Sequence, residues 1–196
     1  MLVHKVFPVS IFEFRLENFK EINEKIEKYI YEQKKIDPEG IIRSNSGGWH
    51  SKIFDLKNVN ELLPLIDFSK RCVKSVFDGY NWEFVPEKIN FVGMWSIINP
   101  PGTFNIKHTH PNSLLSAAYY VKAEKKSGPI AFFDPKHVAV MRHPKIKEFN
   151  ELSAEHISFE PEEGKLFLFP AYLEHQVNKN RSDEDRIVIS FNIDSN

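Results

Sequence analysis

Two histidines separated by one residue, His108 and His110, are the part of this sequence best suited to chemistry. Side chains of an extended strand alternate between its faces, so these two would point the same way with Cα atoms about 6.6 Å apart. Two imidazoles at that spacing can bind one metal ion. Surface histidines beside a turn show the same pattern, and Pro111 with Asn112 predicts such a turn. The pair alone therefore leaves a metal site and two solvated side chains both open.

A third histidine and an arginine follow late in the chain. His175 comes after a short corner that ends the apolar stretch 165–169, and Arg186 opens the apolar stretch 186–193. Strand alternation places Arg186 and Ser190 on the face opposite Ile187 and Ile189. That polar face could be solvated or could line an interior pocket. In a pocket, Arg186 would need an anionic partner, because a buried unpaired charge is very costly.

The elements that must position these residues change character near residue 88. Before it, apolar residues at helical spacing predict helices over about 18–35 and 60–78. After it, alternation with period two predicts strands. These strands begin with a long one in which Ile89, Phe91, Gly93, Trp95 and Ile97 share one face, and they continue at about 103–109, 114–122, 129–133, 156–160, 165–169, 174–178 and 186–193. We therefore predict one domain, 1–196, with helical support in 1–86 and a mainly β sandwich or barrel in 87–196.

Three local features carry further predictions. Asn18 and Glu21 have the spacing of a capping box at the start of the first helix. The glycine-rich stretch 44–50 is a loop by composition, in which Trp49 either lines an entrance or pins the loop to the core. Cys72 falls inside the second helix, so we interpret it as a small core residue.

Composition excludes several classes of function. With 196 residues, a net charge of -1 and no long apolar run, the chain shows no sign of binding nucleic acid or a membrane. The single cysteine excludes an intramolecular disulfide and fits a reducing compartment, so we predict a cytoplasmic protein. Exposed sheet edges would be compatible with a homodimer.

The residues that could take part in chemistry also occur in the order that is typical of one enzyme family. The His-x-His pair, a strand with Tyr119 and Tyr120, the pattern Gly-x-Leu-x-x-Phe-Pro-x-x-x-x-His ending at His175, and Arg186 after it resemble the iron(II) and 2-oxoglutarate-dependent dioxygenases. The resemblance covers about residues 88–194. It is greatest to the prolyl-hydroxylase-like branch and, within it, to a group of bacterial and phage oxygenases. It implies a double-stranded β-helix, a cupin-like jelly roll.

The resemblance also implies roles for individual residues. His108, His110 and His175 would be the metal ligands, with Fe(II) as the metal. His110 stands where most of the family has an aspartate or glutamate. Two alternatives are that Asp134 supplies the carboxylate or that water takes the place of His110.

Other residues would bind the cosubstrate 2-oxoglutarate. Arg186 would pair with its distal carboxylate through two parallel hydrogen bonds, and Tyr120 would bind the same group. Ser190 and Asn105 would face the cosubstrate as well. O2 and an unidentified substrate would complete the reaction, with a peptide or prolyl side chain as one candidate.

Two other functions remain open at this point. One is a cupin-like enzyme that uses three histidines without 2-oxoglutarate, and the other is a jelly-roll binding module without activity. Arg186 and Tyr120 distinguish both of these functions from that of a 2-oxoglutarate-dependent enzyme, because only a bound dicarboxylate requires both residues. The stretches 44–50 and 134–155 are candidate lids, and His137 and His143 in the latter are interpreted as solvated.

Overall fold

The computed structural model describes residues 1–136, 144–150 and 152–195 and contains two antiparallel sheets. The larger sheet has the order β1-β9-β6-β11-β4-β3 and the smaller one β2-β5-β10-β7-β8. The strands of the larger sheet are β1 (Phe12–Arg15), β9 (Lys165–Pro170), β6 (Leu115–Lys122), β11 (Arg186–Ser195), β4 (Ile89–Asn99) and β3 (Trp49–His50). Those of the smaller sheet are β2 (Asn45–Ser46), β5 (Phe104–His108), β10 (His175–Val177), β7 (Ile130–Phe133) and β8 (His156–Phe159).

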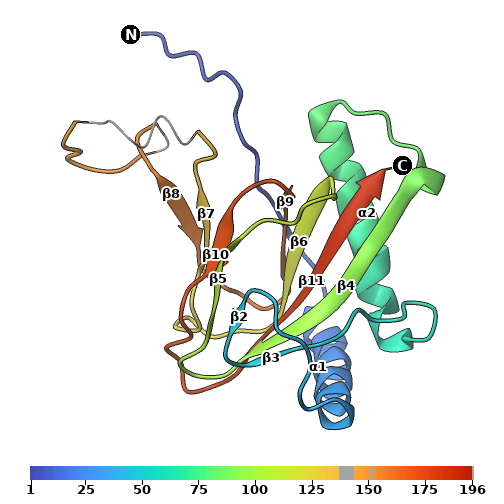
Figure 1. Ribbon diagram of the computed structural model, residues 1–196. Coiled ribbons are helices and arrows are strands. Elements are labelled where there is room, and N and C mark those ends of the chain that lie inside the picture. Colours follow the sequence, from blue (N-terminus) through green and yellow to red (C-terminus); the bar gives the residue numbers. More distant parts are fainter. Residues whose placement is uncertain (137–143, 151, 196) are drawn as a thin grey trace.

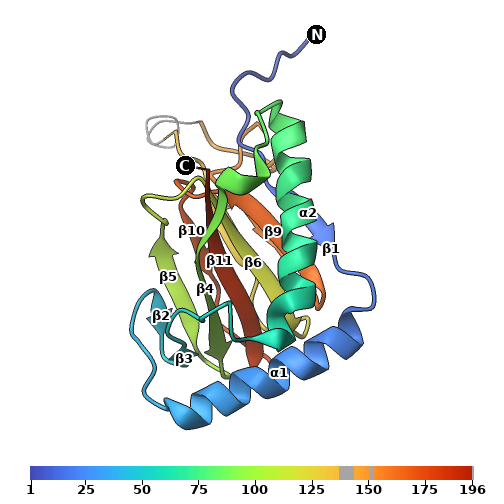
Figure 2. The ribbon, with the colours of Figure 1, turned by 90° about the vertical axis from the view of Figure 1, so that its right-hand side faces the viewer.

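Two long helices cover the outer face of the larger sheet, as Figures 1 and 2 show. They are α1 (Phe19–Ile36) and α2 (Leu63–Tyr80), with short 3-10 turns η1 (Asn60–Leu62) and η2 (Pro86–Lys88) beside them. The main apolar core lies between these helices and the larger sheet. Asn23 of α1 lies in this core, where it donates to the carbonyl of Val121 at 2.7 Å and accepts from the Tyr119 hydroxyl at 2.6 Å. No helix among the described residues is long and apolar enough to span a membrane.

The predicted jelly roll is confirmed, and in the described part of the chain from residue 88 onward it has eight strands, β4 to β11. The alternation of β11 is as predicted. Ile187 and Ile189 pack in the helix-side core, while Arg186 and Ser190 face the space between the sheets. That space also holds a second, smaller apolar cluster, which includes Phe169.

The shared face predicted for the first long strand is wrong. Phe91 packs against Phe191 on the helix side, whereas Trp95 and Ile97 line the space between the sheets. The pairing of β4 with β11 explains the change, because it shifts register so that Val92 is an extra residue. Such a bulge moves every following side chain to the opposite face.

Two predictions for the N-terminal half also need correction. Asn18 precedes α1 as expected, but its backbone is left-handed (φ 53°) and its side chain makes no capping hydrogen bond. A capping side chain requires an extended backbone. The stretch 44–50 is not a free loop, because it contains β2 and β3 on either side of Gly47 and Gly48.

This two-strand segment joins the two sheets. β2 pairs with β5 in the smaller sheet, and β3 pairs with β4 in the larger one. Both glycines have positive φ, 75° and 71°, which the sharp corner between the strands requires. We call residues 40–50 the mouth segment, since it borders the pocket described below.

Candidate metal centre and pocket

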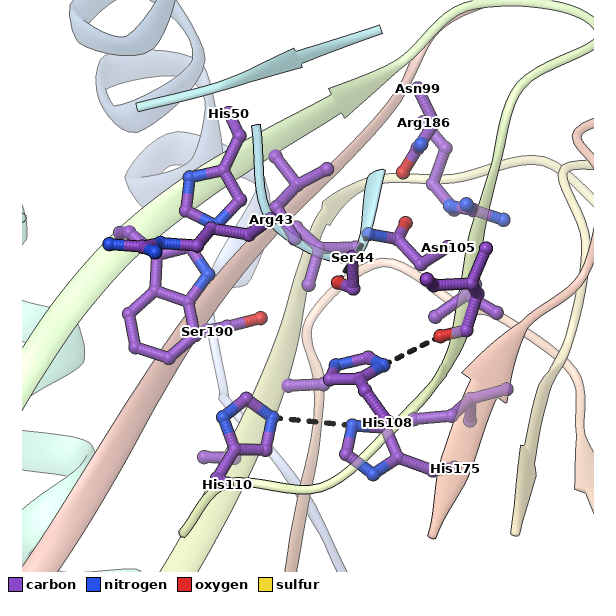
Figure 3. A pocket seen from close by; sticks show the side chains of 18 of the residues that line it. Arg43, Ser44, His50, Asn99, Asn105, His108, His110, His175, Arg186 and Ser190 are labelled. Carbon is purple, nitrogen blue, oxygen red and sulfur yellow. Dashed lines mark hydrogen bonds between the residues drawn. The ribbon is translucent and has the colours of Figure 1, made fainter. Parts of the chain in front are cut away.

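The three predicted histidines come together between the sheets. His108 ends β5, His175 begins β10 as its direct partner in the ladder, and His110 lies two residues beyond β5, just before the turn at Pro111 and Asn112. The backbone N–H of His110 donates to the carbonyl of Ala171 at 2.9 Å, which holds His110 beside the segment that joins β9 to β10. One ring nitrogen from each histidine lies within 4.8 Å of the others. Figure 3 shows the three rings converging on one point.

Hydrogen bonds orient two of these rings for metal binding. Nδ1 of His108 lies 2.7 Å from the carbonyl of Ile106, and Nδ1 of His175 lies 3.0 Å from the carbonyl of Leu173. A carbonyl only accepts, so each Nδ1 carries the hydrogen and each Nε2 keeps its lone pair. The Nε2 atoms of His110 and His175 are 3.4 Å apart. Nitrogens bound at about 2.1 Å to one tetrahedral metal have about this separation.

Burial keeps the three imidazoles neutral. It lowers the pKa of His175 to about 3 and that of His110 to about 4, and it also lowers the pKa of His108. The neighbouring rings contribute to the shifts of His110 and His175. A neutral imidazole is the form that binds a metal, so the cluster fits a divalent cation at neutral pH without first losing protons.

The structure does not bring a carboxylate into this cluster. The predicted alternative ligand, Asp134, accepts a hydrogen bond from the backbone N–H of Lys136 at 2.9 Å, as expected for an ordinary turn. Glu174 points elsewhere and pairs with Lys107 at 3.1 Å. Within the described part of the chain, the candidate ligand set is therefore three histidines.

A pocket of about 580 Å³ opens in front of the histidines, and Arg186 lies at its inner end. The side chain of Arg186 is completely buried. Its Nη1 donates to the carbonyls of Ser127, Gly128 (3.0 Å) and Asn178 (3.2 Å). Its Nε and Nη2 have no partner. Burial lowers the pKa of Arg186 to about 10, and nearby Tyr120 opposes that shift.

Asn99 adds another unpaired donor at the same end. It is the direct partner of Arg186 in the β4–β11 ladder, is 1% exposed and lines the pocket. Its Nδ2 has no hydrogen-bond partner. Figure 3 shows the two side chains next to each other. Buried donors are rarely left unpaired, so this end of the pocket fits an anionic acceptor.

The other predicted cosubstrate residues also line the pocket. Tyr120 and Asn105 are buried there, and Ser190 lies on the β11 face predicted for it. The side-chain amide of Asn105 donates to Ser44 Oγ at 3.1 Å, so Asn105 supports the mouth segment as well.

Sequence reasoning missed several pocket residues, among them Asn99, His50 and Arg43. Asn99 continues the alternation of Trp95 and Ile97, a signal that could have found it. His50 is stacked against Trp95 with ring centres 5.9 Å apart, and Arg43 also lines the pocket. His50 belongs to the stretch 44–50, whose composition predicts a loop, and Arg43 immediately precedes that stretch.

Trp49 does not line the pocket. It is buried in the helix-side core, and its Nε1 donates to the Asp37 carbonyl at 2.8 Å, so it pins the mouth segment. His156 begins β8, exposed, and its ring contacts Phe133 outside the cluster. His137 and His143 lie outside the described residues.

The fold and the pocket define a class of protein. A jelly roll that holds a histidine metal site between its sheets, with a buried arginine behind it, is the arrangement expected for a 2-oxoglutarate-dependent oxygenase. Residues 93–192 match the family described as "Putative 2OG-Fe(II) oxygenase", and the chain belongs to that family. The protein is therefore an oxidoreductase that uses Fe(II) and 2-oxoglutarate, as predicted.

Solved structures support the same fold. A prolyl-4-hydroxylase from Pseudomonas putida is similar with a TM-score of 0.69 and 11% identity, over 96% of this chain and 94% of that one. A viral collagen prolyl hydroxylase from Paramecium Bursaria Chlorella virus-1 has a TM-score of 0.60 and 13% identity, over 92% and 94%. HygX from Streptomyces hygroscopicus, with nickel and 2-oxoglutarate bound, has a TM-score of 0.64 and 12% identity, over 95% and 83%. No curated protein sequence matches this chain.

Proposed function

We propose that the protein is a hydroxylase that couples the oxidative decarboxylation of 2-oxoglutarate to the hydroxylation of a substrate C–H bond. In this reaction one oxygen atom of O2 enters succinate, the other enters the substrate hydroxyl group, and CO2 is released. The observation that carries the proposal is the set of unpaired donors on Arg186 and Asn99 at the inner end of the pocket. A dicarboxylate bound there would satisfy them.

In this proposal His108, His110 and His175 hold Fe(II), which supplies the redox chemistry with O2. The residues of the chain position and protect the reactants. The fork of Arg186 binds the distal carboxylate of 2-oxoglutarate in a place sealed from water, where charged hydrogen bonds are strong. Ser190, Tyr120 and Asn105 line the space between the fork and the metal centre.

The use of three imidazoles has an electrostatic consequence. Family members with a carboxylate ligand place one negative charge on the metal, and this chain places none. The site keeps one more positive charge, which favours the dianion of 2-oxoglutarate. Neutral imidazoles bind zinc, copper and nickel as well as iron, so this site depends less on ligand type to select iron.

A spectroscopic titration tests the proposal. Anaerobic apoprotein is titrated with Fe(II) and then with 2-oxoglutarate, and the visible charge-transfer band of the chelated complex is recorded. We expect the band in the wild type, no band in His175→Ala and a much weaker 2-oxoglutarate affinity in Arg186→Met. Bound iron without a band would favour a three-histidine enzyme that does not use 2-oxoglutarate. Absence of metal binding would favour a binding module.

The hydroxylated substrate is not assigned by the likeness to solved structures. These include a collagen prolyl hydroxylase and HygX with hygromycin B bound, at 11–13% identity. A prolyl side chain stays a prediction. The pocket itself offers a more specific argument about the substrate.

A further inference from the structure

The charges that line the pocket are unbalanced. Among the described residues that line it, the only fully charged side chains are Arg43 and Arg186, and no carboxylate is present. The histidines of the metal centre add no negative charge. Arg186 lies at the inner end, where the dicarboxylate is proposed to bind. Arg43 is an exposed residue at the mouth and has no counterion within the pocket.

Arg43 belongs to the mouth segment, and its place there is fixed by the backbone. The N–H of Ile41 donates to the carbonyl of His50 at 2.9 Å, and the N–H of Ile106 donates to the carbonyl of Ser44 at 2.8 Å. The N–H of Arg43 itself donates to Asn45 Oδ1 at 2.9 Å. Each side of Arg43 is thus tied to a different strand, so its Cα has little freedom to leave the pocket.

The guanidinium of Arg43 lies across the pocket from Arg186. Figure 3 shows it beside His50, on the side away from Arg186. Its charge reaches His50, whose pKa is lowered mainly by burial and in part by Arg43. No ion pair joins Arg43 to any carboxylate in the described ranges, unlike Arg15, which pairs with Glu162.

Aliphatic side chains line the same pocket as this cation. Ile42 is 85% exposed and Ile53 is 65% exposed, and both line the pocket together with Ile106. Trp95 and Ile97 continue the apolar wall inward. Exposed isoleucines gathered at a pocket mouth are unfavourable in water and indicate a surface that is covered when a ligand binds.

We propose that the substrate is a small acid, an apolar body carrying an oxyanion, and that Arg43 binds the oxyanion while the isoleucines and Trp95 contact the body. Arg43 would thereby fix which C–H bond of the body faces the metal centre. Carboxylate and phosphate offer the same acceptor geometry to a guanidinium, so both are sources of this oxyanion. The inference rests on the proposed function, because the inner end must already be filled by 2-oxoglutarate.

The test measures binding of matched probes to protein loaded with Zn(II) and N-oxalylglycine, which occupy the metal and cosubstrate sites without turnover. The probes are para-fluorophenylacetate, para-fluorobenzylphosphonate and neutral para-fluorophenylacetamide, titrated by fluorine NMR. The variants are Arg43→Gln and Arg43→Lys. Arg71→Gln is the matched control, since Arg71 is an exposed arginine of α2 outside the pocket.

We expect at least one acid to bind the wild type about fivefold or more tightly than the amide, as a partly exposed ion pair provides. Arg43→Gln should abolish this preference, Arg43→Lys should keep part of it, and Arg71→Gln should keep all of it. The relative affinities of the carboxylate and the phosphonate identify the source of the oxyanion.

Three results would overturn the inference: equal binding of acids and amide by the wild type, no saturable binding of either acid, or an unchanged preference in Arg43→Gln. The spectroscopic band of the wild type with Fe(II) and 2-oxoglutarate reports on the proposed function separately. A band without acid preference would remove this inference alone. Acid preference without a band would remove the hydroxylase and leave an anion site at Arg43.

Discussion

Replacing Arg186 by methionine should affect stability and ligand binding in different ways. The guanidinium is fully buried, and among its nitrogens only Nη1 has hydrogen-bond partners, all of them carbonyls. Methionine removes those hydrogen bonds, each of which contributes about 1.5–3 kcal/mol when one partner is charged. It also removes a buried charge, whose effective desolvation costs several kcal/mol. The two effects oppose each other, so we expect the ligand-free variant to unfold within a few degrees of the wild type.

The effect on 2-oxoglutarate binding has no such compensation. Truncating one partner of a buried charge pair typically costs about 2–5 kcal/mol of binding free energy, and about 2.7 kcal/mol corresponds to a hundredfold weaker Kd. A ligand at a hundred times its Kd stabilises the folded state by about 2.7 kcal/mol. For a domain of this size that is a rise in Tm of about 5–11 °C. At the same concentration the variant would gain only about 0.4 kcal/mol, or about 1–2 °C.

Thermal unfolding of Zn(II)-loaded protein with and without 2-oxoglutarate measures both the stability of the protein and the rise in Tm that the ligand causes. Arg186→Lys is the matched control for charge, since it keeps the cation without the planar fork, and we expect an intermediate shift. A variant that keeps the full ligand-induced rise in Tm would refute the assignment of Arg186 as the carboxylate anchor. A ligand-free variant that loses far more stability than the ligand-induced gain would refute the reasoning about compensation.

Three further outcomes are expected. Because the pKa values of His110 and His175 are about 4 and about 3 in the folded protein and 6.5 ordinarily, their contribution to stability is complete above pH 6.5 and is lost as the pH falls toward 4. As the pH falls through that window, protonation of each histidine should reduce the unfolding free energy of metal-free protein by about 1.4 kcal/mol per pH unit. Urea titration measures this free energy, and a value that stays constant from about pH 7 to 5 would contradict the prediction. Asn99→Leu removes an unpaired buried amide, so calorimetry should show about fivefold to tenfold weaker 2-oxoglutarate binding while the unfolding free energy stays equal or rises; undiminished affinity would exclude Asn99 from the site. Gly128→Ala places a Cβ against the carbonyl of Asn178 and 2.8 Å from Nη1 of Arg186, at φ 94°, and should lower both Tm and 2-oxoglutarate affinity, whereas Gly102→Ala, at φ 90° with nothing nearer than 3.7 Å, should lower Tm only.

The eight jelly-roll strands could be predicted because most of them bury at least one face. Strand β11 illustrates this, since Ile187 and Ile189 must face the core and so determine where Arg186 points. The alternation of side chains between the two faces of a strand no longer predicts which face a residue occupies where the pairing with the neighbouring strand is irregular. The bulge at Val92 in β4 has one sign in the sequence, the neighbouring Gly93, because an isolated glycine within a strand often marks a bulge.

The mouth segment shows a second reason why part of the structure could not be predicted from the sequence. Residues 44–50 have the composition of a loop, and their two short strands exist only because β4 and β5 offer edges to pair with. Tertiary contacts of this kind override local propensity. For the same reason sequence patterns gave no sign that His50 and Arg43 would border the pocket.

The candidate ligands could be predicted from the sequence because each lies at a fixed place relative to a strand. His108 and His175 end and begin neighbouring strands, so the ladder between β5 and β10 determines their distance. The inner end of the pocket could be predicted from the sequence only in part. The unpaired state of Asn99 Nδ2 depends on which acceptors surround it, and only coordinates reveal that.

The mouth segment has a mechanical consequence. Its middle is hydrogen-bonded to the smaller sheet through β2, its C-terminal end to the larger sheet through β3, and the Trp49 indole fastens it to the C-terminal end of α1. Pulling the two sheets apart would therefore break ladder hydrogen bonds on one side or the other. Because opening the aperture would break these ladders, we expect the mouth segment to keep the width of this side of the pocket fixed and not to close over it as a lid.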